Sequence, residues 1–342
     1  MRKPPPVAAY TSHEVMDLKK RTLLPVLLAM AVLILDSRCA ADSARAALEL
    51  CLQRLIPVLL PLFVFSAMAV PVLSGLRVPG LARLLRVSRG SEGIVLLGCI
   101  GGFPIGAACV AQAAGAGALK KAEAERMIGI SSFCGPAFLF GIIGTVFSLR
   151  EAGVLFLIQL ETAVLTAMLW PGTSESTFSG DLMPPVSLSA AVKRAAVSMA
   201  TVCSWVTLAG VAAGFLRRWL GPLLPRAAAV LLTGLLELTT GVFALEELAV
   251  PELRFVLCAV FVCFGGISVL LQICGLVAPC GLSVVPCIAQ KAVQGILGGL
   301  LAAGTVLVGP GFLLSGLILP AAKIAVEISG TMVYNGRRKE GI

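Results

Sequence analysis

The stretch GIVLLGCIGGFPIGAACVAQAAGAGAL, residues 93–119, is apolar almost throughout, yet it carries glycine and proline at its centre. A second stretch of this kind, AAAVLLTGLLELTTGVFALEEL, occupies residues 227–248 and has Gly, Glu and Thr at its centre. Backbone that leaves the helix inside a bilayer is tolerated only where protein or a wet cavity covers it. We therefore expect each stretch to enter the membrane, turn and leave on the same side, as a re-entrant hairpin.

The whole chain has the composition of a membrane protein. Of its 342 residues, 58% are hydrophobic and 13% are charged, whereas a soluble domain has about 45–50% apolar and about 25% charged residues. The apolar runs are about 20 residues long and do not alternate with period two, which favours spanning helices over the strands of a barrel. We expect an all-α polytopic protein of the cell membrane.

Positive charge is concentrated in short segments between the apolar runs. The Lys and Arg residues, which give the chain a net charge of +9, cluster at residues 19–21, 77–89, 120–126, 193–194 and 337–339. This is the usual bias of cytoplasmic loops, with a smaller contribution from anionic lipid headgroups. We expect the lipid bilayer, and not a nucleic acid, to be the partner of these charges.

The cysteine and histidine content argues against an enzyme or a metalloprotein. The eleven cysteines include no C-x-x-C pair, and most lie inside apolar segments, where a free Cys behaves as a small hydrophobe. The only histidine, His13, lies in the polar N-terminal tail, which removes the common His-based catalytic arrangements. We expect no catalytic residue, no cofactor and no metal, and no transport driven by ATP bound to this chain.

Two motifs recur along the chain and indicate a duplication. Residues 101–107 (GGFPIGA) resemble residues 234–241 (GLLELTTG), and residues 132–136 (SFCGP) resemble residues 263–266 (CFGG). The flanking apolar runs follow the same spacing, 55–76 against 190–215 and 154–170 against 284–306. We predict a tail and first span (1–42), a first repeat (43–172), a loop (173–187), a second repeat (188–307) and a last span with a basic tail (308–342).

The predicted hairpins decide the topology. If both re-enter, each repeat crosses the membrane three times, an odd number, and the two repeats are inverted relative to each other. With spans at 22–35 and 311–333 this gives eight crossings and both termini in the cytoplasm. The basic clusters then fall inside, as the positive-inside bias requires. Arg217, Arg218 and Arg226, which lie outside these clusters in the sequence, fall on the outer side of the membrane and count against this topology. Ten full crossings would instead move residues 120–126 outside. A signal peptide is the alternative for the first run, and an uncleaved span is preferred.

The centres of the hairpins are the first candidate site. Broken helices leave free N–H groups that attract anions and free carbonyls that hold cations. The alternative is that the glycines at these centres only allow tight packing of helices. The residues of the two tips that we expect to bind substrate are Gly101, Gly102, Phe103, Pro104, Gly106, Thr239 and Thr240.

The broken spans that follow the hairpins supply a second layer of polar groups. Serine in a span often bonds to its own helix, so these serines are weak signals individually. The amide of Gln272 is a stronger one, because it needs partners in hydrocarbon. The expected site residues in this layer are Ser131, Ser132, Gly135, Gly265, Gly266, Ser268 and Gln272.

Ionisable residues inside spans are functional candidates, since a central charge costs about 2.5–3.5 kcal/mol on insertion scales. Glu237, at the second tip, is expected to couple transport by binding Na⁺ or carrying a proton. Lys291 can meet an anionic substrate or snorkel to the interface, and Gln294 follows it one turn later. Gln159 occupies the equivalent place in the first half. For Lys323 and Glu327, a structural ion pair is the better interpretation.

The ordered set of motifs resembles a known family. GGFPIGA, KKAEAER (120–126), SSFCGPAFLFG (131–141), GLLELTTG and FGGISVLLQ (264–272) are similar to those of the sporulation integral membrane proteins of the YlbJ type, which carry a nucleoside-recognition Gate domain. The resemblance covers roughly residues 45–330. It departs from the family at Phe103, where a tyrosine would be familiar, and at Leu271.

The resemblance implies a fold similar to concentrative nucleoside transporters and a place in the outer forespore membrane. The substrate that it implies is dipicolinic acid, a planar dianion suited to helix N-termini, hydroxyl groups and Lys291, with Phe103 stacked on its ring. We therefore expect a transporter of a small anion, coupled to H⁺ or Na⁺, for which a homo-oligomer is an open alternative. A nucleoside-type transporter and a non-transporting membrane scaffold for spore maturation are the competing hypotheses.

Overall fold

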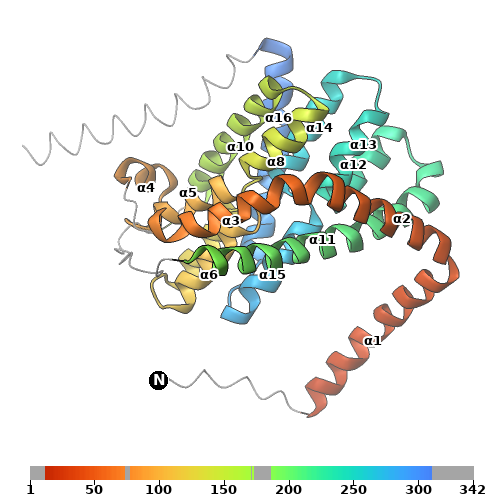
Figure 1. The fold of residues 1–342 in the computed structure, drawn as a ribbon, viewed down its shortest axis with the longest axis horizontal. Coiled ribbons are helices and arrows are strands. Elements are labelled where there is room, and N and C mark those ends of the chain that lie inside the picture. The colour runs from red at the N-terminus through yellow and green to blue at the C-terminus, as the bar shows by residue number, and fades with distance from the viewer. Residues whose placement is uncertain (1–11, 74–77, 171, 173–185, 310–342) are drawn as a thin grey trace, which may run out of the picture.

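Helices make up all the regular structure in the part of the chain that the computed structural model describes, residues 12–73, 78–170, 172 and 186–309 (Figure 1). This confirms the predicted all-α class. The first half contains α1 (Ser12–Leu35), α2 (Ser37–Leu50), the π-helical turn η1 (Cys51–Leu55), α3 (Ile56–Leu73), α4 (Pro79–Leu85), α5 (Glu92–Gly101), α6 (Ile105–Gly115), α7 (Lys121–Ile130), α8 (Pro136–Phe138), η2 (Leu139–Ile143), α9 (Gly144–Val146) and α10 (Leu149–Leu169). The second half contains α11 (Leu188–Trp219), η3 (Gly221–Leu223), α12 (Arg226–Leu236), α13 (Leu238–Ala244), η4 (Leu245–Glu247), α14 (Pro251–Phe264), α15 (Ile267–Val277), η5 (Ala278–Cys280) and α16 (Val285–Val308).

Several helices are long and apolar enough to cross a membrane, which supports the predicted membrane location. Five such segments occur among the described residues: Ser37–Ala69, Leu149–Leu169, Leu188–Trp219, Pro251–Cys280 and Val285–Val308. The predicted broken span of the first half is interrupted at residues 131–135 and does not form one long helix. The predicted last span at 311–333, with Lys323, Glu327 and the basic cluster that follows, lies outside the described residues.

The predicted first span is a helix that projects from the bundle. In Figure 1, α1 extends away from the other helices and joins them at α2, against which it packs. Its apolar part, Leu23–Leu35, is shorter than the ~17 residues that a span normally needs. Large side chains there are exposed, with Leu24 at 73% and Leu35 at 85%. Its role as a span stays a prediction.

Each Gly-rich stretch folds into two short helices separated at the predicted centre. The first hairpin is α5 and α6, and the second is α12 and α13. With 10 and 11 residues, α5 and α6 are about 15 and 17 Å long, roughly half of the ~30 Å hydrocarbon core. The two arms of each hairpin are in close contact. A Cβ on Gly106 would lie 3.0 Å from the Cα of Gly98, and one on Gly241 would collide with the Cα of Gly234.

The helices that follow each hairpin are also broken. The first break, residues 131–135, separates α7 from α8, and the second break, Gly265 and Gly266, separates α14 from α15. Both glycines of the second break have positive φ angles, +89° and +87°. A side chain strains this left-handed backbone, so the turn between α14 and α15 depends on glycine at both positions.

Two long helices run antiparallel along the molecule (Figure 1). The segment α2–η1–α3 is continuous and packs against α11 over much of its length. Asp36, just before α2, forms a 2.8 Å salt bridge with Arg218 near the end of α11. Further along, a Cβ on Gly210 would lie 2.9 Å from that of Ala47. Small residues let the two backbones approach closely.

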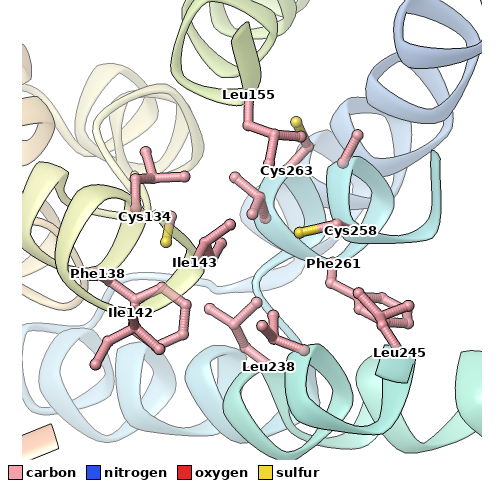
Figure 2. Packing of buried hydrophobic residues seen from close by; sticks show 14 of the residues in the cluster. Cys134, Phe138, Ile142, Ile143, Leu155, Leu238, Leu245, Cys258, Phe261 and Cys263 are labelled. Atoms are coloured by element: carbon pink, nitrogen blue, oxygen red, sulfur yellow. The ribbon is translucent and has the colours of Figure 1, made fainter. Parts of the chain in front are cut away.

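The two halves share two hydrophobic clusters, each built from residues of both. Figure 2 shows Phe138 and Ile143 of the first half beside Leu238 and Cys258 of the second, while the ring of Phe261 points toward Leu245. Phe261 and Ile143 are completely buried. Apolar side chains of each half are buried by the other half. Packing between the halves therefore positions the breaks and the hairpins.

One basic cluster is less exposed than its composition predicts. Arg126, in the segment 120–126, is buried and donates hydrogen bonds to the carbonyls of Leu85 (3.3 Å), Arg86 (2.5 Å) and Trp170 (3.3 Å). These carbonyls belong to the C-terminal ends of α4 and α10, where the helix dipole attracts a cation. This arginine, in α7, therefore fixes the ends of two other helices.

Candidate functional site

The tips of both hairpins meet at one small cavity of about 60 Å³, which we call the central cavity. The first tip contributes Gly101, Gly102 and Phe103, and the second contributes Glu237, Leu238 and Thr239. The remaining lining residues are Leu55, Leu59, Leu62, Phe63, Cys134, Gly135, Ala137, Phe138, Val202, Val206, Val269 and Gln272. The wall is mostly apolar, and Glu237 is its charged member, with Gln272 as the nearby amide.

The first tip packs against both breaks. Gly102 turns the chain with φ +73°, and a Cβ on it would lie 2.7 Å from the nitrogen of Gly135 in the first break. The ring of Phe103 lies over the second break, since a Cβ on Gly265 would be 2.9 Å from its Cζ. Phe103 therefore ties the first hairpin to the second half of the chain while one side of it borders the cavity.

The second tip is organised by the carboxylate of Glu237. Its Oε1 accepts a hydrogen bond from the N–H of Thr239 (3.0 Å), and its Oε2 accepts bonds from the N–H (2.6 Å) and hydroxyl (2.8 Å) of Thr240. The side chain is 2% exposed. These donors satisfy the free N–H groups at the start of α13 and stabilise the charged carboxylate. Across the break, a Cβ on Gly266 would lie 3.1 Å from the nitrogen of Leu238.

Three side chains from other helices hold the first break. Gln159 accepts from the N–H of Cys134 (2.7 Å) and donates to its carbonyl (3.0 Å). Gln294 donates to the carbonyl of Gly129 (3.3 Å), and Lys291 donates to that of Ser132 (2.9 Å). Lys291 has no exposed surface, which rules out the alternative that it snorkels to the interface.

The predicted site residues therefore separate into two groups. Seven line the central cavity: Gly101, Gly102, Phe103, Gly135, Glu237, Thr239 and Gln272. The others support the tips and breaks and are not part of its wall: Pro104, Gly106, Ser131, Ser132, Thr240, Gly265, Gly266, Ser268, Lys291 and Gln294. Their substrate-binding roles stay predictions.

The two serines of the first break satisfy their hydroxyl groups locally. Ser131 and Ser132 both donate to the carbonyl of Ile128, at 3.3 and 2.6 Å. Ser268, next to the second break, accepts from Gln272 at 3.4 Å. The alternative reading of mid-helix serines, bonding to their own helix, is correct for the first pair.

A crevice lies beyond the central cavity at each end of the long helices. The Thr240 crevice is lined by Ser43, Ala46, Ala47, Leu50, Gly210, Ala213, Gly214, Arg217, Thr240, Phe243, Ala244 and Glu247. The Arg194 crevice is lined by Phe63, Ala67, Ile105, Ala108, Cys109, Gln112, Arg194, Ala195 and Ser198. Exposed charged residues at each one, such as Arg217 and Arg194, show that both reach the surface.

The three hollows follow one another along α11. The Thr240 crevice contacts residues 210–217, the central cavity residues 202 and 206, and the Arg194 crevice residues 194–198. The second hairpin lines the Thr240 crevice, and the first hairpin lines the Arg194 crevice. Phe63 belongs to both the central cavity and the Arg194 crevice, so its ring is a barrier between them.

Sequence reasoning missed most of the cavity wall. Leu59, Phe63, Val202 and Val206 are apolar residues of α3 and α11, and on sequence alone such residues face lipid or another helix equally well. Only the polar residues of the tips carry a signal, because polar groups in hydrocarbon need partners.

Comparisons with protein-family models, curated proteins and solved structures found no significant match. The resemblance to the YlbJ type of sporulation protein therefore rests on the motifs quoted above. What it implies about substrate and location enters below as a proposal.

Proposed function

We propose that the chain is a membrane transporter that carries a small organic solute through the central cavity. The observation that carries the proposal is the row of three hollows along α2–η1–α3 and α11, with both hairpin tips at the middle one. Alternating access needs a site at mid-membrane that is approached from each side, and broken helices commonly supply it.

For the architecture, we propose two inverted repeats with re-entrant hairpins and eight crossings, similar to concentrative nucleoside transporters. Equivalent contacts in both halves support this arrangement: Gly102 lies against Gly135 in the first, and Leu238 lies against Gly266 in the second. The antiparallel packing of α2–η1–α3 on α11 also supports it, since these segments hold equivalent places in the two halves.

For the orientation, we propose that both termini and the Arg194 crevice face the cytoplasm. Arg217 and Arg218 fall outside in this topology, but both are paired with acidic residues, Glu247 and Asp36. Together with Arg226 they still count against this orientation, because the positive-inside bias follows the Lys and Arg residues and acidic partners contribute little to it.

For the substrate, we propose a small planar anion, with dipicolinic acid entering the forespore as the candidate that the resemblance implies. Lys291 holds a positive charge 5.1 Å behind the ring of Phe103, which borders the cavity. Glu237 would repel an anion at the same site, because like charges in a low-dielectric cavity interact strongly. We therefore propose that the anion enters together with a proton or cation that neutralises Glu237.

A nucleoside-type substrate is the second candidate, and the cavity wall favours it in one respect. Glu237 and Gln272 offer a hydrogen-bond acceptor and an amide beside an apolar surface, which suits a neutral solute with hydroxyl groups and a flat base. A dicarboxylate dianion, by contrast, has no hydrogen-bond donor to offer the carboxylate of Glu237.

Uptake by the purified protein in liposomes tests these proposals. We expect labelled dipicolinate to accumulate under an inward proton or Na⁺ gradient, faster than in protein-free liposomes. Uptake of uridine with no uptake of dipicolinate would favour the second candidate. If neither solute moves and spores of a Glu237→Gln strain mature normally, the transport proposal is wrong and a scaffold role replaces it.

A further inference from the structure

Four of the carbonyl groups freed at the first break are taken by side chains. Ile128, Gly129, Ser132 and Cys134 have carbonyl oxygens that accept from serine hydroxyls, Gln294, Lys291 and Gln159 respectively. Such carbonyls at the C-terminal end of a helix carry partial negative charge. In broken membrane helices they are where a cation binds.

The ammonium group of Lys291 has the surroundings of a bound cation. Its Nζ donates to the carbonyl oxygen of Ser132 at 2.9 Å and to Oε1 of Gln294 at 2.8 Å. It also lies 5.1 Å from the centre of the Phe103 ring, in cation–π geometry. Two neutral oxygens and one ring face therefore surround the positive charge.

No carboxylate balances this charge among the described residues. Lys291 takes part in none of the ion pairs seen there, such as Arg217–Glu247 and Arg218–Asp36. A buried lysine without an acidic partner is costly unless dipoles compensate it. The end of α7 and the oxygen of Gln294 supply that compensation here, as they would for a metal cation.

The second break lacks this device. Lys291 precedes Gln294 by three residues, and the same step from the equivalent Gln159 leads to Phe156. The second break has Glu237 beside it, within the adjoining tip. The two breaks therefore differ in the charge beside them.

We propose that Lys291 is a built-in counter-cation whose ammonium occupies the place that a free Na⁺ would take at the end of α7. The first break then carries a fixed positive charge and binds no cation from solution. Lys291 is a positioning residue, since it holds Ser132 and Phe103. The inference rests on the proposed function in one respect. With the first break occupied by Lys291, Glu237 is left as the place where a coupling ion acts.

The test compares three forms of the full-length purified protein: the wild type, Lys291→Ala and Lys291→Met. Thermal unfolding is followed by the fluorescence of its three tryptophans in choline, sodium or methylammonium chloride at equal ionic strength. Alanine leaves space beside the oxygens of Ser132 and Gln294, whereas methionine fills it without charge. We expect Na⁺ or methylammonium to raise the midpoint of Lys291→Ala over choline by several degrees more than it raises that of Lys291→Met or the wild type.

Equal responses of Lys291→Ala and Lys291→Met to all three salts would overturn the inference. So would a Na⁺-specific rise in the wild type that persists in Glu237→Gln. If Lys291→Ala does not accumulate, Lys291→Ser replaces it, because serine leaves similar space and adds an oxygen ligand. The comparison needs no transport, so absence of uptake would sink the proposed function alone.

Discussion

Gly102 and Gly135 are in direct backbone contact, with no room for a side chain on either. A Cβ on Gly135 would lie 2.9 Å from the Cα and 3.1 Å from the nitrogen of Gly102. The contact joins the tip of the first hairpin to the break in the following helix, and both residues line the central cavity. The shape of the cavity thus depends on two glycines that are 33 positions apart in the printed sequence.

The first prediction concerns this contact. Gly135→Ala should destabilise the protein by about 1–3 kcal/mol, because the neighbouring atoms are backbone and cannot move aside cheaply. Its φ of −68° is suitable for alanine, so the effect is steric. The midpoint of thermal unfolding measures it. Gly153→Ala is the control, since nothing lies within 4 Å of a Cβ there, and it should be neutral or slightly stabilising. Equal effects of both substitutions would contradict the prediction.

The second prediction concerns Glu237. Glu237→Gln should lower uptake by roughly 10-fold to 100-fold, since hydrogen bonds to a charged group contribute about 1.5–3 kcal/mol and the amide cannot accept at both ends. The initial rate in liposomes measures it, with the amount of inserted protein as the reference. Glu246→Gln, at an exposed position on the same hairpin, should transport normally. Wild-type rates in Glu237→Gln would remove Glu237 from the mechanism.

The third prediction concerns the barrier at Phe63. Phe63→Ala should raise the passive leak of preloaded solute severalfold, because the ring separates the central cavity from the Arg194 crevice. Phe65→Ala, two residues along α3, is the matched control, since Phe65 is 67% exposed while Phe63 is 5% exposed. Efflux without a gradient measures the leak. If both variants leak alike, the barrier lies elsewhere.

The fourth prediction concerns Gln159. Gln159→Leu leaves the buried N–H and carbonyl of Cys134 unpaired, at about 1–3 kcal/mol for each group. We expect a clear fall in the unfolding midpoint and loss of uptake, because the first break is no longer held in place. Gln53→Leu changes an exposed glutamine and should have little effect. An unchanged midpoint in Gln159→Leu would show that water replaces the lost hydrogen bonds.

The fifth prediction concerns the path of the first hairpin. Arg89→Cys and Ala116→Cys, introduced separately into a cysteine-free background, place thiols at exposed positions before α5 and after α6. If the hairpin is re-entrant, a membrane-impermeant maleimide labels both from the same side as Arg194→Cys. Labelling from opposite sides would require full crossings and would end the inverted-repeat proposal.

The sequence by itself determined the helical class, the membrane environment and the places where helices break. Apolar runs without period-two alternation exclude a sheet, and glycine with proline or glutamate inside such runs interrupts them, as the turns at Gly102 and Glu237 show. These properties are local, since they depend on side chains a few residues apart. Glu237 was also recognisable, because a carboxylate in an apolar run is costly wherever it lies.

Only the tertiary structure decided what the breaks face. Lys291 has the sequence signature of a substrate ligand or a snorkelling residue, but the packing of α16 against α7 places its ammonium on the carbonyl of Ser132. The cavity wall at Phe63 and Val206 is equally invisible in the sequence, because an apolar side chain carries no mark of whether it faces lipid, protein or a cavity. That choice depends on contacts between segments more than a hundred residues apart, which no local pattern encodes.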